Sequence, residues 1–179
     1  VLPDQFLDFT KCRHTSFFDG GENGVVHVDM TEPYCPNLRR TVAAAAQALG
    51  GYTLHDKGTY VCTEGPRFET PAEIRMYEKL GGDLVGMTNV PEVCLAREAE
   101  ICYANCSVVT NMGSGLSVRA LSHEEVTEAM EKLGKQILAV IEAYVQDDGP
   151  LDRTCHCHEA LKEYGGFRLE AFGGDKKEE

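Results

Sequence analysis

Apolar residues recur at helical spacing in four parts of the chain, and residues that start or end helices bound each part. The first predicted helix covers residues 37–49, and its apolar face consists of Leu38, Val42, Ala45 and Leu49. It ends at the Gly50-Gly51 pair. Glycine readily takes the left-handed backbone conformation that commonly closes a helix, so this boundary is well marked.

Three further helices are predicted downstream. Residues 70–73 (Thr-Pro-Ala-Glu) supply a capping hydroxyl, a first-turn proline and a returning carboxylate for the second helix. A third helix opens at Pro91. Ser122 and Glu125 form another capping box, and the long apolar stripe behind it reaches Val145. We expect this last helix to pack on a sheet.

Short runs rich in β-forming residues lie between the predicted helices, at residues 24–28, 59–63, 84–87 and 107–110. Strands that alternate with helices favour an α/β fold with a mixed, mostly parallel sheet flanked by helices. We expect residues 1–146 to form one partial α/β domain. Residues 147–179 are polar and glycine-rich, and they are predicted to be a peripheral tail.

The composition narrows the class of partner. The formal net charge of −12 argues against nucleic acid, because phosphate backbones require clustered Lys and Arg. No apolar run approaches the length of a membrane span, and the opening VLPDQF lacks the basic and then apolar order of a signal peptide. We therefore expect a cytoplasmic protein without a membrane partner.

Three strings follow one another at short intervals: GTYVCTEGPRFET at 58–70, GDLVGMTNVPEV at 82–93 and SVVTNMGSG at 107–115. Each places polar side chains at the end of an apolar run, where open α/β sheets usually bind ligands. The strings and their order resemble the trimeric purine nucleoside phosphorylase family, which includes methylthioadenosine phosphorylase. The resemblance covers about residues 1–145.

This resemblance implies a transferase of the glycosyltransferase, or pentosyltransferase, class that works in purine salvage. The reaction is phosphorolysis of the N-glycosidic bond, with inorganic phosphate as co-substrate and no cofactor or metal. The family also implies a homo-oligomer, either a trimer or a dimer of trimers. The small-molecule partners would be a purine nucleoside and phosphate.

Asn111 and Glu69 are the predicted catalytic residues, and both indicate a 6-oxopurine. An Asn amide can donate a hydrogen bond to a 6-keto oxygen, whereas the family's 6-aminopurine branch usually has Asp there. An ionised Glu accepts the N1–H that hypoxanthine and guanine carry and adenine lacks. Alternatively, Asn111 is an ordinary turn residue. The Glu69 carboxylate could likewise only stabilise the N-terminus of the next helix.

The remaining predicted contacts are to substrate. The family implies that Phe68 stacks on the base, Met87 touches the sugar, and Thr88 and Thr110 belong to the polar substrate site. Phe and Met are otherwise most often core residues. Thr88 could instead cap the turn before the helix that Pro91 opens.

Two histidines match residues of different branches of the family. His123 matches a histidine near the sugar 5′ position in nucleoside-cleaving members, although a first-turn helical His is usually only solvated. His27 matches a residue of methylthioadenosine phosphorylases that reaches into the neighbouring subunit's pocket. S-methyl-5′-thioinosine and methylthioadenosine phosphorylases therefore remain alternatives to an inosine- or guanosine-cleaving enzyme.

Family members carry an N-terminal portion with a first strand and a glycine-rich phosphate loop, and nothing before Val1 matches it. We expect the chain to be truncated there and to have little or no activity alone. A non-catalytic purine-binding fragment is the alternative to an enzyme. Losing strands would also expose a sheet edge.

Eight cysteines are present, and most are predicted to be buried thiols. The Cys155-His156-Cys157-His158 run could be a plain surface segment, a redox pair or part of a metal site. It is similar to the C-x-C tails of some heat-stable archaeal family members, in which the cysteines form disulfides. Zinc ligands usually lie two to four residues apart with a second pair elsewhere, and no second pair is evident. We therefore predict no metal site.

Overall fold

In the computed structural model, three parallel strands form the sheet in the order β1-β2-β3. They are β1 (Gln5–Phe9), β2 (Thr59–Thr63) and β3 (Leu84–Gly86), and Leu7, Val61 and Val85 lie in register across them. The structure describes every residue except 52, 118–122, 147–153, 170–171 and 173–179, and it leaves the side chains of residues 123 and 125 undescribed.

The central strand β2 is buried on both faces, which explains its almost uninterrupted apolar sequence. Tyr60 and Cys62 belong to one core cluster, which also contains Val90 and Val93. Val61 points the other way and packs against Ile74 and Tyr77. Because successive strand residues face opposite sides, one strand anchors both halves of the core.

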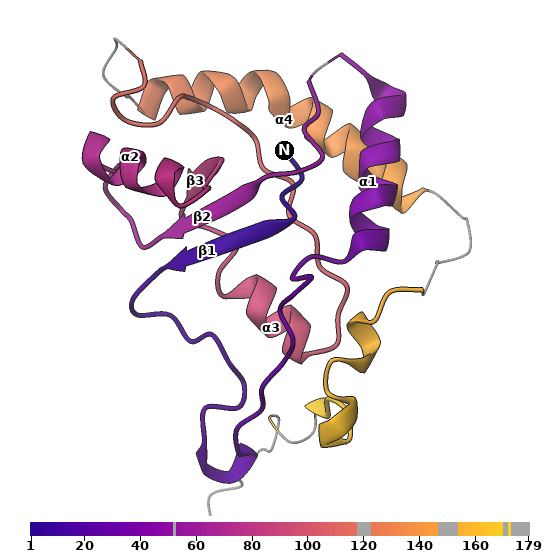
Figure 1. Ribbon diagram of the computed structural model, residues 1–179. Coiled ribbons are helices and arrows are strands. Elements are labelled where there is room, and N and C mark those ends of the chain that lie inside the picture. Colours follow the sequence, from indigo (N-terminus) through magenta and orange to yellow (C-terminus); the bar gives the residue numbers. More distant parts are fainter. Residues whose placement is uncertain (52, 118–122, 147–153, 170–171, 173–179) are drawn as a thin grey trace, which may run out of the picture.

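Helices cover both faces of the sheet (Figure 1). α3 (Glu92–Glu98) supplies Val93 to one cluster, and α2 (Pro71–Lys79) supplies Ile74 and Tyr77 to the other. α1 (Pro36–Leu49) packs against α4 (His123–Val145) at the end of the sheet. Three short 3-10 helices complete the described elements: η1 (Gly21–Asn23), η2 (Cys157–Glu159) and η3 (Lys162–Tyr164).

The predicted α/β class is confirmed, and all described strand pairs are parallel. The four predicted helices are present within a residue or so at the ends that the structure describes. The Thr70 hydroxyl accepts the backbone N–H of Glu73 while the Glu73 carboxylate accepts that of Thr70, as a capping box requires. The predicted cap at Ser122 lies outside the described residues.

Two predicted strands are wrong. Residues 24–28 have no neighbouring strand, and only an isolated antiparallel bridge joins Val25 to Asp19. Val25 remains 59% exposed. Its β-branched side chain has a high propensity for strands, but that propensity alone does not bury it in a sheet. Residues 107–110 are also outside the sheet, although Ser107 exchanges backbone hydrogen bonds with Val1 at 2.8 and 2.9 Å. The strand β1 was missed.

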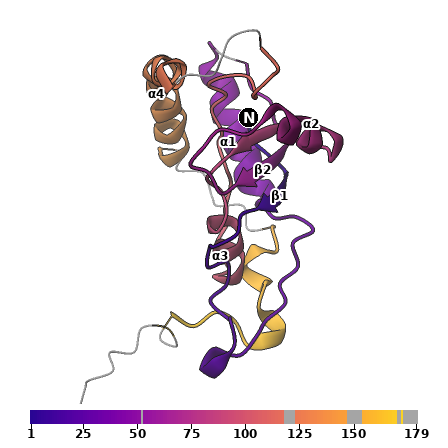
Figure 2. The same cartoon turned by 90° about the vertical axis from the view of Figure 1, so that its left-hand side faces the viewer.

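The described part of the tail packs on the body of the molecule, beside α3 and the segment that contains η1 (Figure 2). The Glu100 carboxylate accepts the backbone N–H groups of Leu161 and Phe167 at 3.0 and 3.1 Å. Leu161 is 1% exposed. Four aromatic rings from the body and the tail pack together: Phe17, Phe18, Phe167 and Phe172.

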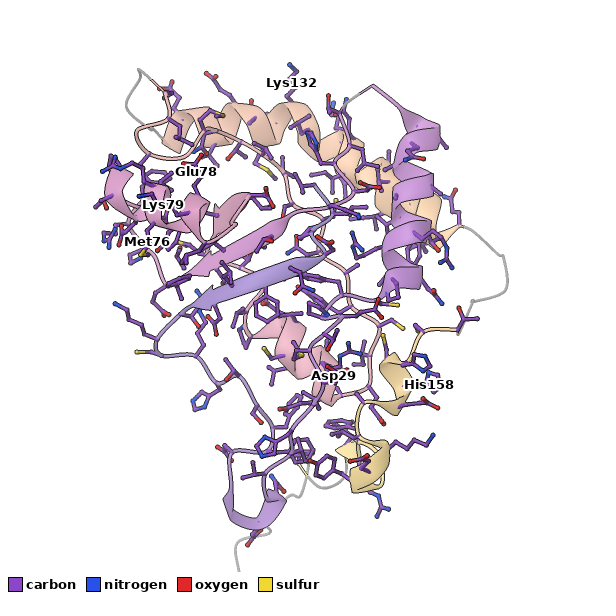
Figure 3. The ribbon with its side chains drawn as sticks, in the orientation of Figure 1. Asp29, Met76, Glu78, Lys79, Lys132 and His158 are labelled. Carbon is purple, nitrogen blue, oxygen red and sulfur yellow. The ribbon has the colours of Figure 1, made fainter. Side chains whose placement is uncertain are left out.

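The surface is rich in charged side chains, as the composition predicts. Figure 3 shows Glu78 and Lys79 near the end of α2 and Lys132 on α4, and all three are exposed. No described helix combines the length and the apolar character that a membrane span needs.

Candidate functional site

Four of the predicted site residues, Phe68, Glu69, Met87 and Thr88, lie on the loops that follow β2 and β3, at the carboxyl edge of the parallel sheet. Glu69 accepts a hydrogen bond from the Thr63 hydroxyl, the last residue of β2, through Oε1 at 2.8 Å. Among the described residues, no donor hydrogen-bonds to its second oxygen, Oε2. The fold therefore fixes one carboxylate oxygen and leaves the other free to accept a ligand's N–H.

Met87 and Thr88 follow β3 and lie beside the loop that follows β2. A Cβ at Gly65 would stand 2.1 Å from the Met87 sulfur, so the absence of a side chain at Gly65 lets Met87 lie over this loop. Met87 and Phe68 are 47% and 48% exposed. Two large apolar side chains left open on adjacent loops are suited to covering an apolar ligand face.

The Thr88 hydroxyl is held by Tyr60, whose oxygen lies 3.0 Å from Thr88 Oγ1. The Thr88 backbone N–H also donates to the Tyr60 oxygen at 3.3 Å. Burial raises the pKa of Tyr60, so its phenol stays protonated and can donate to Thr88 while it accepts from the backbone. Thr88 itself is exposed, and its hydrogen bonds to Tyr60 fix its orientation.

The loop that carries Asn111 packs against the N-terminus of α2. Within that loop, a Cβ at Gly113 would lie 3.2 Å from Ile74, and one at Gly115 would lie 2.7 Å from Pro71. The α2 N-terminus directly follows Glu69, so the fold brings the loops of the two predicted catalytic residues to the same place.

In this state the Asn111 amide is occupied by its own loop. The Thr110 hydroxyl donates to Asn111 Oδ1 at 2.7 Å, and Asn111 Nδ2 donates to the Met112 carbonyl at 3.0 Å. With Oδ1 accepting and one N–H bound, the second amide N–H faces no described acceptor. Asn111 can therefore stabilise its own turn and still donate a hydrogen bond to a ligand.

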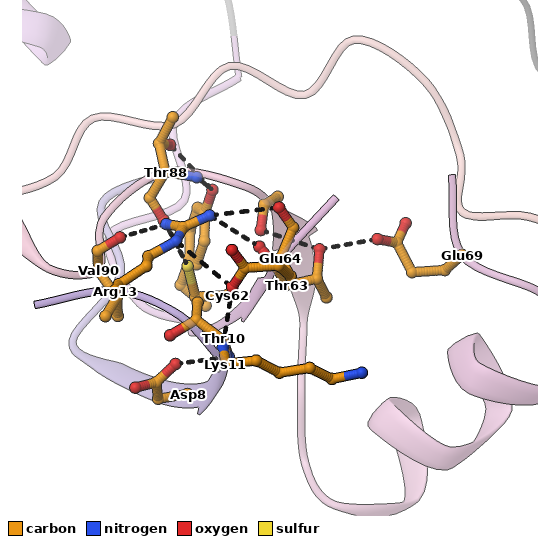
Figure 4. A network of polar contacts seen from close by, with 12 residues as sticks. Asp8, Thr10, Lys11, Arg13, Cys62, Thr63, Glu64, Glu69, Thr88 and Val90 are labelled. Atoms are coloured by element: carbon orange, nitrogen blue, oxygen red, sulfur yellow. Dashed lines mark hydrogen bonds and ion pairs between the residues drawn. The ribbon is translucent and has the colours of Figure 1, made fainter. Parts of the chain in front are cut away.

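Arg13 organises the same edge of the sheet and was missed by the sequence reading (Figure 4). Its guanidinium donates to the carbonyls of Val90, Thr63 (3.2 Å) and Glu64 (3.5 Å), and Nε lies 3.7 Å from the Glu64 carboxylate. Its side chain is 18% exposed. Arg13 therefore ties the end of β2 to the loop after β3. Prediction of β1 would have placed this arginine at a strand end, where it could be noticed.

The two histidines are not part of this arrangement in the described structure. His27 is exposed, and its backbone N–H donates to the Tyr164 hydroxyl of the tail at 3.2 Å. His123 is the first residue of α4, and its side chain lies outside the described part of the chain. Their predicted roles stay predictions.

A separate apolar cavity of about 320 Å³ lies between α1 and α4. Its walls include Val42, Ala46, Leu133, Ile137 and Val140. None of the predicted site residues lines it. The cavity lies apart from the sheet edge where those residues gather.

The expectation that no second cysteine pair accompanies Cys155 and Cys157 is wrong. Cys35 and Cys102 join them, and the four sulfur atoms all lie within 4.8 Å of one another. The two pairs are distant in the sequence, so spacing alone could not reveal them. The fold of residues 1–146 builds one half of this cluster and the tail builds the other.

A model of the phosphorylase superfamily matches residues 1–146. The chain belongs to this superfamily, and the predicted resemblance is confirmed. The sheet edge described above lies wholly within the matched range, whereas residues 147–179 lie outside it.

Individual relatives agree with this assignment. The chain is 54% identical to the probable 6-oxopurine nucleoside phosphorylase of Moorella thermoacetica, over 88% of this chain and 60% of that protein. It is 52% identical to the probable S-methyl-5′-thioinosine phosphorylase of Methanopyrus kandleri, over 90% and 61%.

A methylthioadenosine phosphorylase from an Antarctic soil metagenomic library has a similar structure, with a TM-score of 0.79 and 35% identity over 90% of this chain and 57% of that one. The chain thus spans about three fifths of the length of the curated relatives it matches.

Proposed function

We propose that the protein carrying this chain is a purine nucleoside phosphorylase that acts on 6-oxopurine nucleosides such as inosine and guanosine. A phosphate oxygen bonds to the anomeric carbon, the bond from that carbon to purine N9 breaks, and its electrons leave with the base. The products are free purine and ribose 1-phosphate. Inorganic phosphate is the co-substrate, and the reaction needs no cofactor or metal.

One observation carries this proposal: the loops of Glu69 and Asn111 meet at the N-terminus of α2. Glu69 Oε2 is free to accept the N1–H of a 6-oxopurine. The Asn111 amide can donate to the 6-keto oxygen or N7. Because negative charge develops on the base as it leaves, a donor at this rim binds the transition state more tightly than the substrate, which lowers the barrier.

The neighbouring side chains complete the pocket in this proposal. Phe68 stacks on the base and Met87 covers the sugar, and their exposed apolar surfaces support these roles. Thr88 and Thr110 contribute hydroxyls to the phosphate and sugar end. The Tyr60 phenol orients the Thr88 hydroxyl, so this donor is held in place before substrate arrives.

The working unit in this proposal is a cytoplasmic homo-oligomer, a trimer or a dimer of trimers. His27 then reaches the pocket of a neighbouring subunit, which its exposure permits. His123 contacts the 5′ end of the sugar.

A second candidate substrate is S-methyl-5′-thioinosine. A relative with 52% identity carries that name, and the same base-reading pair would serve because this substrate also contains hypoxanthine. The two substrates differ only at the 5′ position, away from Glu69 and Asn111.

The test is a comparison of phosphate-dependent base release from inosine, guanosine, methylthioinosine and methylthioadenosine by the full-length protein. We expect hypoxanthine and guanine release that requires phosphate, and little adenine release. Preference for methylthioinosine would favour the second candidate. Preference for methylthioadenosine would overturn the 6-oxopurine assignment, and hypoxanthine binding by calorimetry without turnover would indicate a non-catalytic purine-binding protein.

A further inference from the structure

Four cysteine thiols from three separate parts of the chain converge beneath the first turn of α1. Cys35 precedes α1, Cys102 follows α3, and Cys155 and Cys157 come from the tail. Their sulfur atoms all lie within 4.8 Å of one another, and those of Cys102 and Cys155 are 3.6 Å apart. All four are free thiols in this structure.

The spacing of these sulfurs is close to that of a tetrahedral metal site. Zinc bonds thiolate sulfur at about 2.3 Å, which places the sulfurs of a regular tetrahedron ~3.8 Å apart. Small side-chain rotations would therefore suffice to bring the four sulfurs around one ion. A disulfide joins only two sulfurs and gives no reason for a third and fourth to gather.

The burial of the four residues also suits a closed structural site. Cys35, Cys155 and Cys157 are between 2% and 5% exposed, whereas Cys102 is exposed and leaves a path for the ion to enter. The Leu38 backbone N–H at the start of α1 donates to the Cys35 sulfur at 3.4 Å. Such peptide N–H groups stabilise metal-bound thiolate and fix its orientation.

The short C-x-C spacing does not prevent both tail cysteines from binding one ion. His156 between them has φ −94° and ψ 14°, so the chain is folded into the start of η2 rather than extended. Both sulfurs consequently face Cys35 and Cys102. The histidines turn elsewhere: His156 Nδ1 lies 3.2 Å from the Glu159 carboxylate, and its side chain is 83% exposed.

We propose that Cys35, Cys102, Cys155 and Cys157 bind one zinc ion as a tetrahedral structural site that fastens the tail to the superfamily domain. On binding, Zn²⁺ takes four thiolates and four protons are released, which leaves the site with a net charge of about −2. An all-sulfur tetrahedral set favours zinc over magnesium, calcium or manganese, which prefer oxygen ligands. With all four positions filled by protein, no position remains for substrate.

The zinc site would join the superfamily domain to the tail. Cys35 and Cys102 lie within the range matched by the superfamily, and Cys155 and Cys157 lie beyond it. The other described links between tail and domain are noncovalent, such as the two amide hydrogen bonds to Glu100. A metal bound by both parts therefore sets how firmly the tail is held.

The direct test is the zinc content of the full-length protein, purified with reductant, loaded with zinc and dialysed. We expect about one zinc per chain by mass spectrometry of the metal. The Cys102→Ser variant should lose it, and because Cys102 is exposed this change should leave the fold intact. The matched control is Cys12→Ser, which changes another exposed thiol outside the cluster and should keep the zinc.

Two further measurements keep the result decisive. After denaturation with a chelator and no reductant, the eight cysteines of this chain should all react in the zinc form, whereas two disulfides in the cluster would leave only four of these eight reactive. Removing zinc from the folded protein should also speed hydrogen exchange of the Leu161 amide. A reduced protein that holds no zinc, or that holds iron instead, would overturn the proposal, and so would a Cys102→Ser variant with undiminished zinc.

Discussion

The sheet-edge site and the four-cysteine cluster are built in opposite ways from the same chain. The site uses three strings within residues 58–115; the first two include β2 and β3, and the third packs on the N-terminus of α2. The cluster joins Cys35, Cys102, Cys155 and Cys157, which no local pattern connects. A site made of short strings that lie close together in the sequence can therefore be recognised from those strings, whereas a site made by long-range convergence appears only in the folded chain.

The two regions also differ in what they leave open. At the sheet edge, Phe68 and Met87 are about half exposed and Glu69 keeps one oxygen without a described donor. In the cluster, three of the four residues are almost fully buried. Open polar and apolar groups are suited to a ligand that comes and goes. Enclosed thiols are suited to a permanent bond that adds stability.

The largest effect is expected from Asn111→Asp in the full-length protein. The carboxylate can accept from an exocyclic amine but cannot donate to a 6-keto oxygen, so preference should shift from inosine towards adenosine. A site built for one hydrogen-bonding edge can discriminate by up to ~10⁴-fold, which sets the upper limit of the shift. The measurement is the ratio of kcat/KM for the two nucleosides.

The matched control is Asn23→Asp, an exposed position in η1 far from the site loops along the chain. It should leave the ratio unchanged. An unchanged ratio in Asn111→Asp as well would show that Asn111 is only a turn residue.

The next effect in size is that of Glu69→Gln. The amide oxygen can still accept from the Thr63 hydroxyl, so the fold should be kept, but the charged acceptor for N1–H is lost. Hydrogen bonds to charged groups contribute about 1.5–3 kcal/mol, so kcat/KM for inosine should fall ~10- to 100-fold. Glu78→Gln, an exposed change on α2, should have no effect. A similar loss in both variants would point to net charge rather than to a base contact.

Much of the fold was predictable because its signals are local. The Thr70 capping box and the β2 run each combine several agreeing signals within a few residues. The strand β1 was missed because burial of one edge strand depends on its pairing with β2, more than fifty residues away. Residues 24–28 were wrongly predicted as a strand because β propensity cannot say whether a partner strand is available.

In the candidate site, too, local features were predictable and long-range contacts were not. The loops of Glu69 and Met87 lie together because parallel strands end at one edge, whereas the Asn111 loop reaches them by packing on the N-terminus of α2. Arg13 was missed, since its role comes from carbonyls of Thr63 and Val90 that only the fold brings near it. The partner sulfurs of Cys155 and Cys157 were missed for the same reason.

Glu100→Gln tests how firmly the tail is held on the domain. One of the two oxygens that accept the Leu161 and Phe167 amides becomes an NH₂ group facing a donor. An unsatisfied buried N–H costs about 1–3 kcal/mol, and the tail should be cleaved faster in limited proteolysis. Glu163→Gln, at an exposed tail position, is the control. Base preference should not change, and a change there would mean that tail and sheet edge are coupled.

The smallest expected effect is the pH dependence contributed by Glu73 at the edge of the site. The hydrogen bond from Arg67, followed by that from the Thr70 backbone, lowers the Glu73 pKa from its ordinary 4.5 to about 2. Because the folded-state pKa is depressed, this stabilisation is fully present above pH 4.5 and is lost as the pH falls towards 2. Solvent screening keeps it small. Thermal unfolding of Glu73→Gln should therefore differ from the unmodified chain at pH 7 and converge with it near pH 2, since protonated Glu and Gln are alike. A difference that persists at pH 2 would mean that Glu73 acts through packing of the α2 cap rather than through its charge.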